Sequence, residues 1–151
     1  MNNDTTINHV PAFNNYFENG EVSHEFKKEF VTLWPEWLGE ENYHKLDEVT
    51  KPEWGRFNLL IRNISKQYKL LLVNLKEKTI SKINDLEKTL ASYDDSRNKS
   101  SNEFSVLIIP YLDCILTEDW DYTYIIWYRN KKAVERLDPI ITESELYHFS
   151  E

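Results

Sequence analysis

The sequence predicts an α+β fold in which helices come first and a β-hairpin and a C-terminal helix follow, packed as one layer pair. Three observations support this order. Apolar residues recur every three or four positions in the N-terminal half, and residues 56–93 contain neither glycine nor proline. Beyond residue 103 the pattern changes to runs of β-branched and aromatic residues, which are typical of strands.

The first expected helix begins at Ser23, a residue type suited to the N-cap position. Phe26, Phe30 and Trp34 follow at intervals of four and would form one apolar stripe. Pro35 would end this helix, because the residue before a proline avoids the helical conformation.

The segment from Gly55 to about Tyr93 is expected to form one long amphipathic helix, either continuous or broken near Asn74, where the register slips. Its apolar positions repeat at alternating spacings of four and three. They are Phe57, Ile61, Ile64, Tyr68, Leu71 and Leu75, and the pattern resumes at Thr79, Ile83, Leu86, Leu90 and Tyr93. An alternative is a buried strand over residues 68–75, because that stretch is apolar on every side.

The remaining segments read as alternating turns and regular elements. Residues 94–102 form a polar loop, and one or two strands follow it. A turn at 118–121 leads into a second strand over 121–129, rich in β-branched and aromatic side chains. A helix over 131–145 is expected to be disturbed by Pro139. The last residues either return as a short strand or pack on the core.

We expect one domain over residues 1–151, with residues 1–14 as a loose polar tail. Aromatic residues make up 14% of the chain, which is enough apolar mass for a core without disulfides. No run approaches the roughly 18 apolar residues of a membrane span, and the N-terminus lacks the features of a signal peptide. Because Cys114 is the single cysteine, we expect the chain to work in the cytoplasm.

The formal net charge of −8 is unevenly distributed. Residues 1–54 carry −7, residues 55–92 carry +5 and residues 93–151 carry −6. A basic central segment taken alone favours nucleic-acid binding, but the acidic flanks would repel phosphate. We therefore expect the basic side chains to face the acidic flanks of the same chain, and we expect neither nucleic acid nor a membrane as partner.

The sequence carries no catalytic signature, so we expect neither an enzyme nor a cofactor. It lacks a G-x-S-x-G motif and a glycine-rich phosphate loop, and its cysteine lies in an apolar run. Three Glu-x-x-His pairs leave a metal-binding protein or metalloenzyme as an alternative, because residues i and i+3 share a helix face. These pairs are Glu21–His24, Glu41–His44 and Glu145–His148.

The acidic and aromatic turn at 118–121 is the strongest candidate for a binding surface. Tryptophan and tyrosine are favoured interface anchors, and an acidic rim around them would steer a basic partner toward the surface. We predict that the partner-binding residues are Asp113, Glu118, Asp119, Trp120, Asp121 and Tyr122.

These observations favour an acidic binding or inhibitor protein that neutralises a basic protein partner. The immunity protein of a nuclease-like bacterial toxin is a specific case of this class. A further alternative is a helical adaptor that dimerises through residues 57–93 as a coiled-coil seam.

Overall fold

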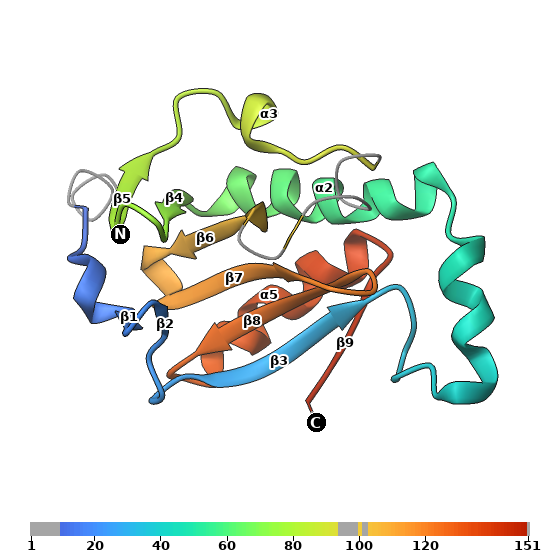
Figure 1. Cartoon of the computed structure of the whole chain (residues 1–151). Coiled ribbons are helices and arrows are strands. Elements are labelled where there is room, and N and C mark those ends of the chain that lie inside the picture. The colour runs from blue at the N-terminus through green and yellow to red at the C-terminus, as the bar shows by residue number, and fades with distance from the viewer. Residues whose placement is uncertain (1–9, 94–99, 101–102, 151) are drawn as a thin grey trace.

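A seven-stranded antiparallel sheet forms the centre of the molecule (Figure 1). The computed structural model describes residues 10–93, 100 and 103–150, and within this part the sheet has the strand order β5-β4-β6-β7-β8-β3-β9. A two-stranded ribbon, β1–β2, precedes it. The strands are β1 (Phe17–Glu18), β2 (Glu21–Val22), β3 (Lys27–Thr32), β4 (Leu71–Asn74), β5 (Thr79–Lys82), β6 (Val106–Ile109), β7 (Cys114–Asp119), β8 (Thr123–Tyr128) and β9 (Tyr147–Phe149).

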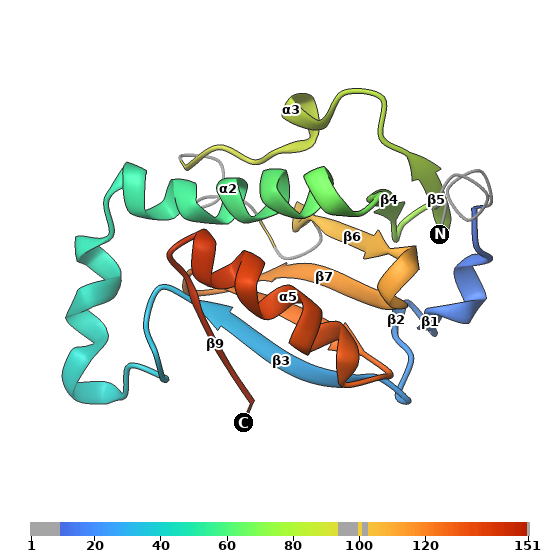
Figure 2. The ribbon, with the colours of Figure 1, turned by 180° about the vertical axis from the view of Figure 1, so that it is seen from behind.

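Two longer helices, α2 and α5, lie together on one face of this sheet (Figure 2). α2 begins with a capping box, in which Thr50 and Glu53 satisfy each other's backbone N–H groups. The helical segments are η1 (Phe13–Asn15), η2 (Glu40–Glu48), α2 (Lys51–Gln67), α3 (Leu86–Thr89), η4 (Pro110–Leu112) and α5 (Lys132–Glu143).

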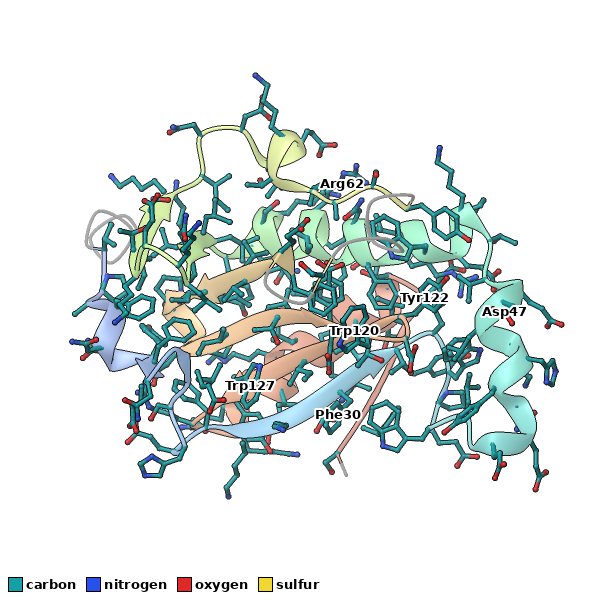
Figure 3. All side chains as sticks on the ribbon, viewed as in Figure 1. Phe30, Asp47, Arg62, Trp120, Tyr122 and Trp127 are labelled. Carbon is teal, nitrogen blue, oxygen red and sulfur yellow. The ribbon has the colours of Figure 1, made fainter. Side chains whose placement is uncertain are left out.

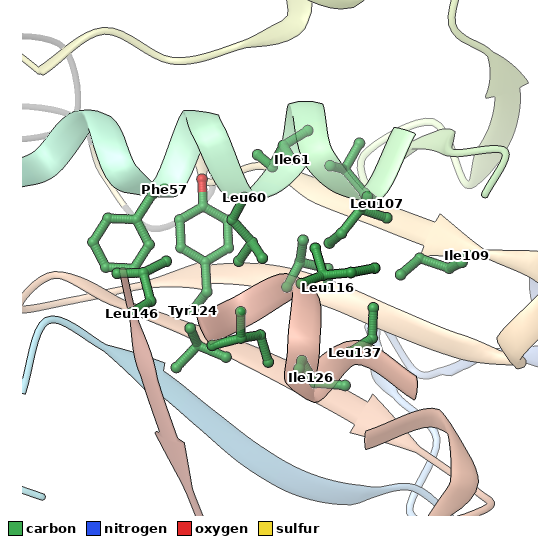
Figure 4. Close-up of a cluster of buried hydrophobic side chains, with 14 of the residues drawn as sticks. Phe57, Leu60, Ile61, Leu107, Ile109, Leu116, Tyr124, Ile126, Leu137 and Leu146 are labelled. Atoms are coloured by element: carbon green, nitrogen blue, oxygen red, sulfur yellow. The ribbon is translucent and has the colours of Figure 1, made fainter. Parts of the chain in front are cut away.

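The main hydrophobic core fills the space between the two helices and the sheet (Figure 4). Phe57 and Leu60 of α2 and Leu137 of α5 are each no more than 1% exposed. They pack against alternate residues of the strands below, among them Leu116 and Ile126. Because successive strand residues point to opposite faces, this alternation aligns one face of each strand with the helices.

A second, smaller core lies on the opposite face of the sheet. Tyr16 and Phe17, from the segment around β1, cover Ile108 and Ile115 there. Strand β6 is therefore buried on both faces, which explains why its four residues are all apolar. The N-terminal part of the chain thus contributes directly to the core from η1 onward, whereas residues 1–9 of the expected tail lie outside the described residues.

The prediction that helices come first is wrong. The segment predicted as the first helix contains strand β3, which pairs with β8 on one side and with β9 on the other. Phe26 and Phe30 are four residues apart, a spacing that places two side chains on one face of a strand as well as of a helix. Val31 and Thr32 are also buried, so β3 is enclosed on both sides and lacks the polar alternation that would have marked it as a strand.

The long amphipathic helix over 55–93 is also absent, because α2 ends at Gln67. Its C-cap, Tyr68, is already extended, and the chain continues as the β4–β5 hairpin. The alternative of a buried strand near 68–75 is the one that the structure contains. The hairpin turn contains no glycine, and Lys78 takes the left-handed backbone conformation there, with φ 57°. The usual sequence signal for a turn is therefore missing.

A coiled-coil seam through residues 57–93 cannot form on this fold. Phe57 and Ile61 of α2 face the core, and Leu71 is 1% exposed in a central strand. The apolar side chains of the proposed seam are therefore buried inside the molecule, and the adaptor alternative loses its structural basis.

The C-terminal third contains the expected hairpin, as β7 and β8, but as part of the large sheet rather than as a separate layer. α5 runs through Pro139 to Glu143, against the prediction of a disturbance there. The helix buries Ala133, Val134, Leu137, Ile140 and Ile141 in the core, and this burial outweighs the roughly 3 kcal/mol cost of an interior proline. Most of the predicted loop 94–102 lies outside the described residues.

Candidate functional site

The turn between β7 and β8 presents the most unusual backbone of the hairpin. The last paired residues are Asp119 and Thr123, so Trp120, Asp121 and Tyr122 form the tip. Asp121 and Tyr122 both take left-handed conformations, with φ 59° and 57°. Such conformations cost non-glycine residues about 1–3 kcal/mol each and persist only where the surrounding structure imposes them, often at binding sites. The tip is thus held in a fixed, strained shape by the two flanking strands.

Two cavities adjoin this tip. One, of about 270 Å³, lies between the tip and α2 and includes Trp54 and Tyr124 in its lining. The other, of about 380 Å³, lies between the tip and the segment 32–46 and includes Thr32 and Trp37. They share the residues Leu46, Asp119, Trp120, Asp121 and Thr123. We call them the helix-side cavity and the segment-side cavity.

Exposed aromatic rings gather around the segment-side cavity. Trp37, Tyr43 and Trp120 are 46%, 59% and 54% exposed, and all three line it. Trp37 packs edge-on against Phe30 and Phe149, with ring centroids 4.8 and 4.9 Å apart. A surface tryptophan anchored in this way keeps its position without a partner, so that little conformational entropy is lost when a partner binds.

The same surface is strongly acidic. Asp47, Asp119 and Asp121 line the helix-side cavity, and Glu36 lines the segment-side cavity. Asp119 Oδ1 accepts a hydrogen bond from the Trp120 N–H at 2.8 Å. Among the described residues, the carboxylates of Asp47 and Asp121 have no hydrogen-bond or ion-pair partner. Figure 3 places Asp47 on η2, at the end of the sheet where Trp120 and Tyr122 lie.

Tyr124 brings a buried polar group to the helix-side cavity. Its side chain is 3% exposed and stacks on Phe57, with ring centroids 5.2 Å apart. Its hydroxyl is buried and has no hydrogen-bond partner among the described residues. Burial raises the pKa of this hydroxyl, and the charge of Glu118 raises it further, so the group stays protonated. An unsatisfied buried hydroxyl lowers the free energy of unfolding by about 1–3 kcal/mol.

Five of the six predicted contact residues line the helix-side cavity, namely Glu118, Asp119, Trp120, Asp121 and Tyr122. Glu118 lines the helix-side cavity but is 7% exposed, and its Oε1 accepts a hydrogen bond from the Ser105 N–H at 3.0 Å. Its carboxylate serves to fix the chain before β6 rather than to form surface charge. The sequence could not separate Glu118 from Asp119 without knowing which strand face is buried.

Asp113 lies at the opposite end of β7 from the tip. It precedes Cys114, the first residue of β7, whereas Asp119 is the last, so that about 20 Å of strand separates the two carboxylates. Asp113 Oδ1 accepts a hydrogen bond from Arg129 at 2.9 Å, and Glu25 pairs with the same guanidinium. Asp113 therefore lies apart from the other five predicted contact residues, and we leave it out of the proposed binding surface.

Sequence reasoning missed the residues that form the other side of the site. They lie 73 to 88 positions before the hairpin tip in the chain, yet they line the same two cavities: Trp34, Trp37, Tyr43, Leu46 and Asp47. The available signal was the density of tryptophan and tyrosine among acidic residues around Pro35 and Gly39. Because Pro35 also marks the end of a helix, the same residues predict a helix terminus rather than a surface.

The three Glu-x-x-His pairs do not converge. His24 lies 3.3 Å from Glu18, and His148 bridges Glu29 and Asp138 at 2.6 Å each. Glu145 takes the left-handed conformation that follows α5. In the described part of the chain, no group of three or more His, Cys, Asp or Glu side chains is placed to hold a metal ion.

Cys114 is fully buried, and burial raises the pKa of its thiol, which therefore stays protonated near neutral pH.

Arg62, one of the cations of the basic segment, forms a bidentate pair with Glu87 at 2.8 and 2.9 Å. Within the described residues, no helix is both long enough and apolar enough to cross a membrane.

A scan against protein-family models found no match for this chain, and comparisons with curated proteins and with solved structures found none either. The site is therefore interpreted from its own geometry and chemistry.

Proposed function

We propose that this protein is a binding protein that occupies a basic protein partner through the acidic and aromatic surface around the β7–β8 tip. An inhibitor of a basic enzyme, such as the immunity protein of a nuclease-like bacterial toxin, is the specific case that we favour. We place this activity in the cytoplasm, in keeping with a chain that has a single, buried cysteine.

The observation that carries this proposal is the coincidence of exposed rings and free carboxylates at one place. Trp37, Tyr43 and Trp120 supply apolar area that is costly to leave in water, and aromatic anchors of this kind dominate binding energies at interfaces. Asp47 and Asp121 lie beside them, and their carboxylates have no partner in the part of the chain that the structure describes. A complementary surface would therefore carry cations next to apolar or planar groups.

The charge of the whole chain supports the same partner class. At −8, the protein attracts a basic partner over distances of about a Debye length and accelerates their encounter. The aromatic contacts would then slow dissociation, because most affinity differences between related complexes lie in the dissociation rate. The affinity for the partner should consequently fall as the salt concentration rises. The contribution of the aromatic contacts to that affinity should not change with salt.

The experiment is a pull-down from the native host with the full-length protein at low and high salt, followed by mass spectrometry. The decisive variant combines Asp47→Lys with Asp121→Lys. A matched control combines Glu77→Lys with Asp85→Lys, which changes the net charge equally at exposed positions around β5, away from both cavities. We expect one basic protein with the wild type and the control, and its loss with the site variant.

If the two double variants lose the same protein equally, only net charge matters and the proposed surface is wrong. If the wild type captures no basic protein from a host that expresses its target, the binding function itself is wrong.

A further inference from the structure

The segment-side cavity opens on the face of the sheet that lies opposite α2 and α5. Thr32 of β3 and Thr123 of β8 are register partners, and both line it. Val31 and Tyr124, their neighbours in the chain, point instead into the core toward the helices. The cavity is therefore a groove at the strand ends, with the segment 34–46 on one side and the β7–β8 tip on the other.

Two indole rings of this cavity are accessible and at the same time held in place. Trp120 is 54% exposed and packs edge-on against Phe104, with ring centroids 4.7 Å apart. Trp37 is 46% exposed and is held by its edge-on contacts with Phe30 and Phe149. A ligand in the cavity can therefore contact both indole rings without any rearrangement of the core.

Every charged side chain that lines the segment-side cavity is an acid. Glu36, Asp119 and Asp121 line it, and no lysine, arginine or histidine does so in the part of the chain that the structure describes. Asp119 accepts the hydrogen bond of the Trp120 N–H, whereas the carboxylates of Glu36 and Asp121 have no hydrogen-bond or ion-pair partner among the described residues. Because a carboxylate accepts hydrogen bonds and donates none, these groups favour a cation that is rich in donors.

We infer that the segment-side cavity receives an arginine side chain of the basic protein partner. This inference rests on the proposed function and names the chemistry of its central contact. A guanidinium group has five N–H donors, stacks on aromatic rings and is weakly hydrated. It would lie against the exposed indole rings of Trp37 and Trp120 and donate hydrogen bonds to the carboxylates of Glu36 and Asp121.

A lysine side chain meets fewer of these conditions. Its ammonium group is compact and strongly hydrated, so it loses more on leaving water, and it has no plane to stack on an indole ring. A guanidinium can bond to carboxylates along its edge while its faces stay in contact with rings. The cavity should therefore discriminate between the two cations although their charge is equal.

The exposed aromatic surface continues beyond the cavity, which points to a protein as the source of the arginine. Tyr147 of β9 is the register partner of Thr32 and is 48% exposed. Residues next to an arginine in a partner chain would cover this ring. A free small cation in the cavity would leave it in water.

The test uses three capped tripeptides, acetyl-Gly-Arg-Gly-amide and its lysine and citrulline analogues, titrated into the full-length protein at equal ionic strength. Citrulline has the shape of arginine without its charge. Binding is followed by NMR at the indole N–H groups of the five tryptophans, and Trp37→Phe and Trp120→Phe identify two of these signals. We expect saturable shifts of both signals with the arginine peptide, and about tenfold weaker binding of the other two peptides. The signal of Trp127, at the other end of β8, should not move.

Two variants each remove one unpaired carboxylate from the cavity, and both positions are exposed. Glu36→Gln and Asp121→Asn should each weaken binding of the arginine peptide by about threefold to tenfold. Asparagine tolerates the left-handed backbone of position 121. Glu77→Gln is the matched control, because it removes one exposed carboxylate on the β4–β5 hairpin, and it should leave binding unchanged.

A further pair of variants tests the ring contact. Trp120→Leu keeps an apolar side chain but removes the indole, and it should weaken binding of the arginine peptide, followed at Trp37, by about threefold. Tyr111→Leu removes an exposed ring on η4, ahead of the start of β7, and should leave binding unchanged.

Equal binding of the arginine and lysine peptides, no saturable shift at Trp37 and Trp120, or unchanged affinity in all three cavity variants would each overturn this inference. If the pull-down nevertheless captures a basic protein that is lost with Asp47→Lys and Asp121→Lys, the proposed function stands without the arginine contact. If the arginine peptide binds as expected but the wild type captures no basic protein from a host that expresses its target, the assignment of the arginine to a protein partner is overturned.

Discussion

Arg129 donates a hydrogen bond to Asp113 at 2.9 Å, at the end of β7 that lies farthest from the β7–β8 tip. The guanidinium also lies over the ring of Phe26, with 4.2 Å between its central carbon and the ring centroid, and pairs with Glu25. Asp113 is thus part of a local cluster that fixes the start of β7 against the N-terminal segment. The Asp113 carboxylate therefore contributes an ion pair to the fold, and we do not include this residue in the proposed binding surface.

We therefore predict that Asp113→Asn leaves binding of the basic partner unchanged. The variant should lower the free energy of unfolding by about 0.2–1 kcal/mol, because the Asp113 side chain is half exposed and the ion pair is partly screened. Asparagine tolerates the left-handed backbone found at this position, with φ 51°. Urea unfolding and a binding titration check both expectations, and a large loss of affinity would return Asp113 to the site.

Leu71 and Leu75 test the strand that replaces the predicted long helix. On one helix they would share a face and be equivalent, whereas in the structure Leu71 is 1% and Leu75 is 37% exposed. We expect Leu71→Ala to lower the free energy of unfolding by about 2–5 kcal/mol and Leu75→Ala by less than about 0.5 kcal/mol. Similar costs for the two variants, measured by urea unfolding, would support the helix instead.

Trp120 is expected to be an anchor of the interface. Trp120→Ala should weaken partner binding by about 2 kcal/mol, or roughly thirtyfold. Its effect on folding should be limited to the edge-on contact with Phe104, about 0.5–1.5 kcal/mol, since the ring is more than half exposed. Leu75→Ala is the control, as an exposed apolar residue outside the site. Equal affinity of the two variants for the partner would show that Trp120 is not an anchor of the interface.

His148 gives the fold a pH dependence. Burial lowers its pKa, but the hydrogen bonds to Asp138 and Glu29 outweigh this effect, and the net shift is upward. The protonated form is thus favoured in the folded state, so its contribution is fully present below the unfolded pKa of about 6.5 and is lost as the pH rises through the folded pKa.

We predict that the free energy of unfolding of the wild type falls relative to that of His148→Gln as the pH is raised from below 6 into the alkaline range. The difference between the two curves isolates His148 from other titrating groups. Because His148 is paired with β3 through Glu29, the loss should be greatest at β9. Parallel curves for the two proteins would contradict the ion-pair assignment.

How far the sequence determines this fold depends on the element. α2 was predictable as a helix because Thr50 and Glu53 form a capping box and its apolar positions recur with a helical period up to Ile64. β3 was not, because a strand buried on both faces shows no alternation, and Phe26 and Phe30 fit either period. The turn at Lys78 had no glycine to mark it.

The site was predictable only in the part that is continuous in sequence. Trp120 and Asp121 stand out because aspartate is typical of turns and tryptophan is enriched at interfaces. Trp37 and Asp47 reach the same surface only through the β3–β8 pairing, a contact between residues about 100 positions apart. The Tyr124 hydroxyl carries no signal in the sequence, since its lack of a partner is a property of packing.

Hydrogen exchange of the complex shows whether the surface around the β7–β8 tip binds a basic partner. With the protein captured in the pull-down bound to the full-length chain, we predict slowed exchange at residues 36–48 and 118–123. Residues 74–82, on the β4–β5 hairpin, should exchange as in the free protein. Protection confined to 74–82 or to 13–28, with the tip unchanged, would show that the partner binds elsewhere and would contradict the account.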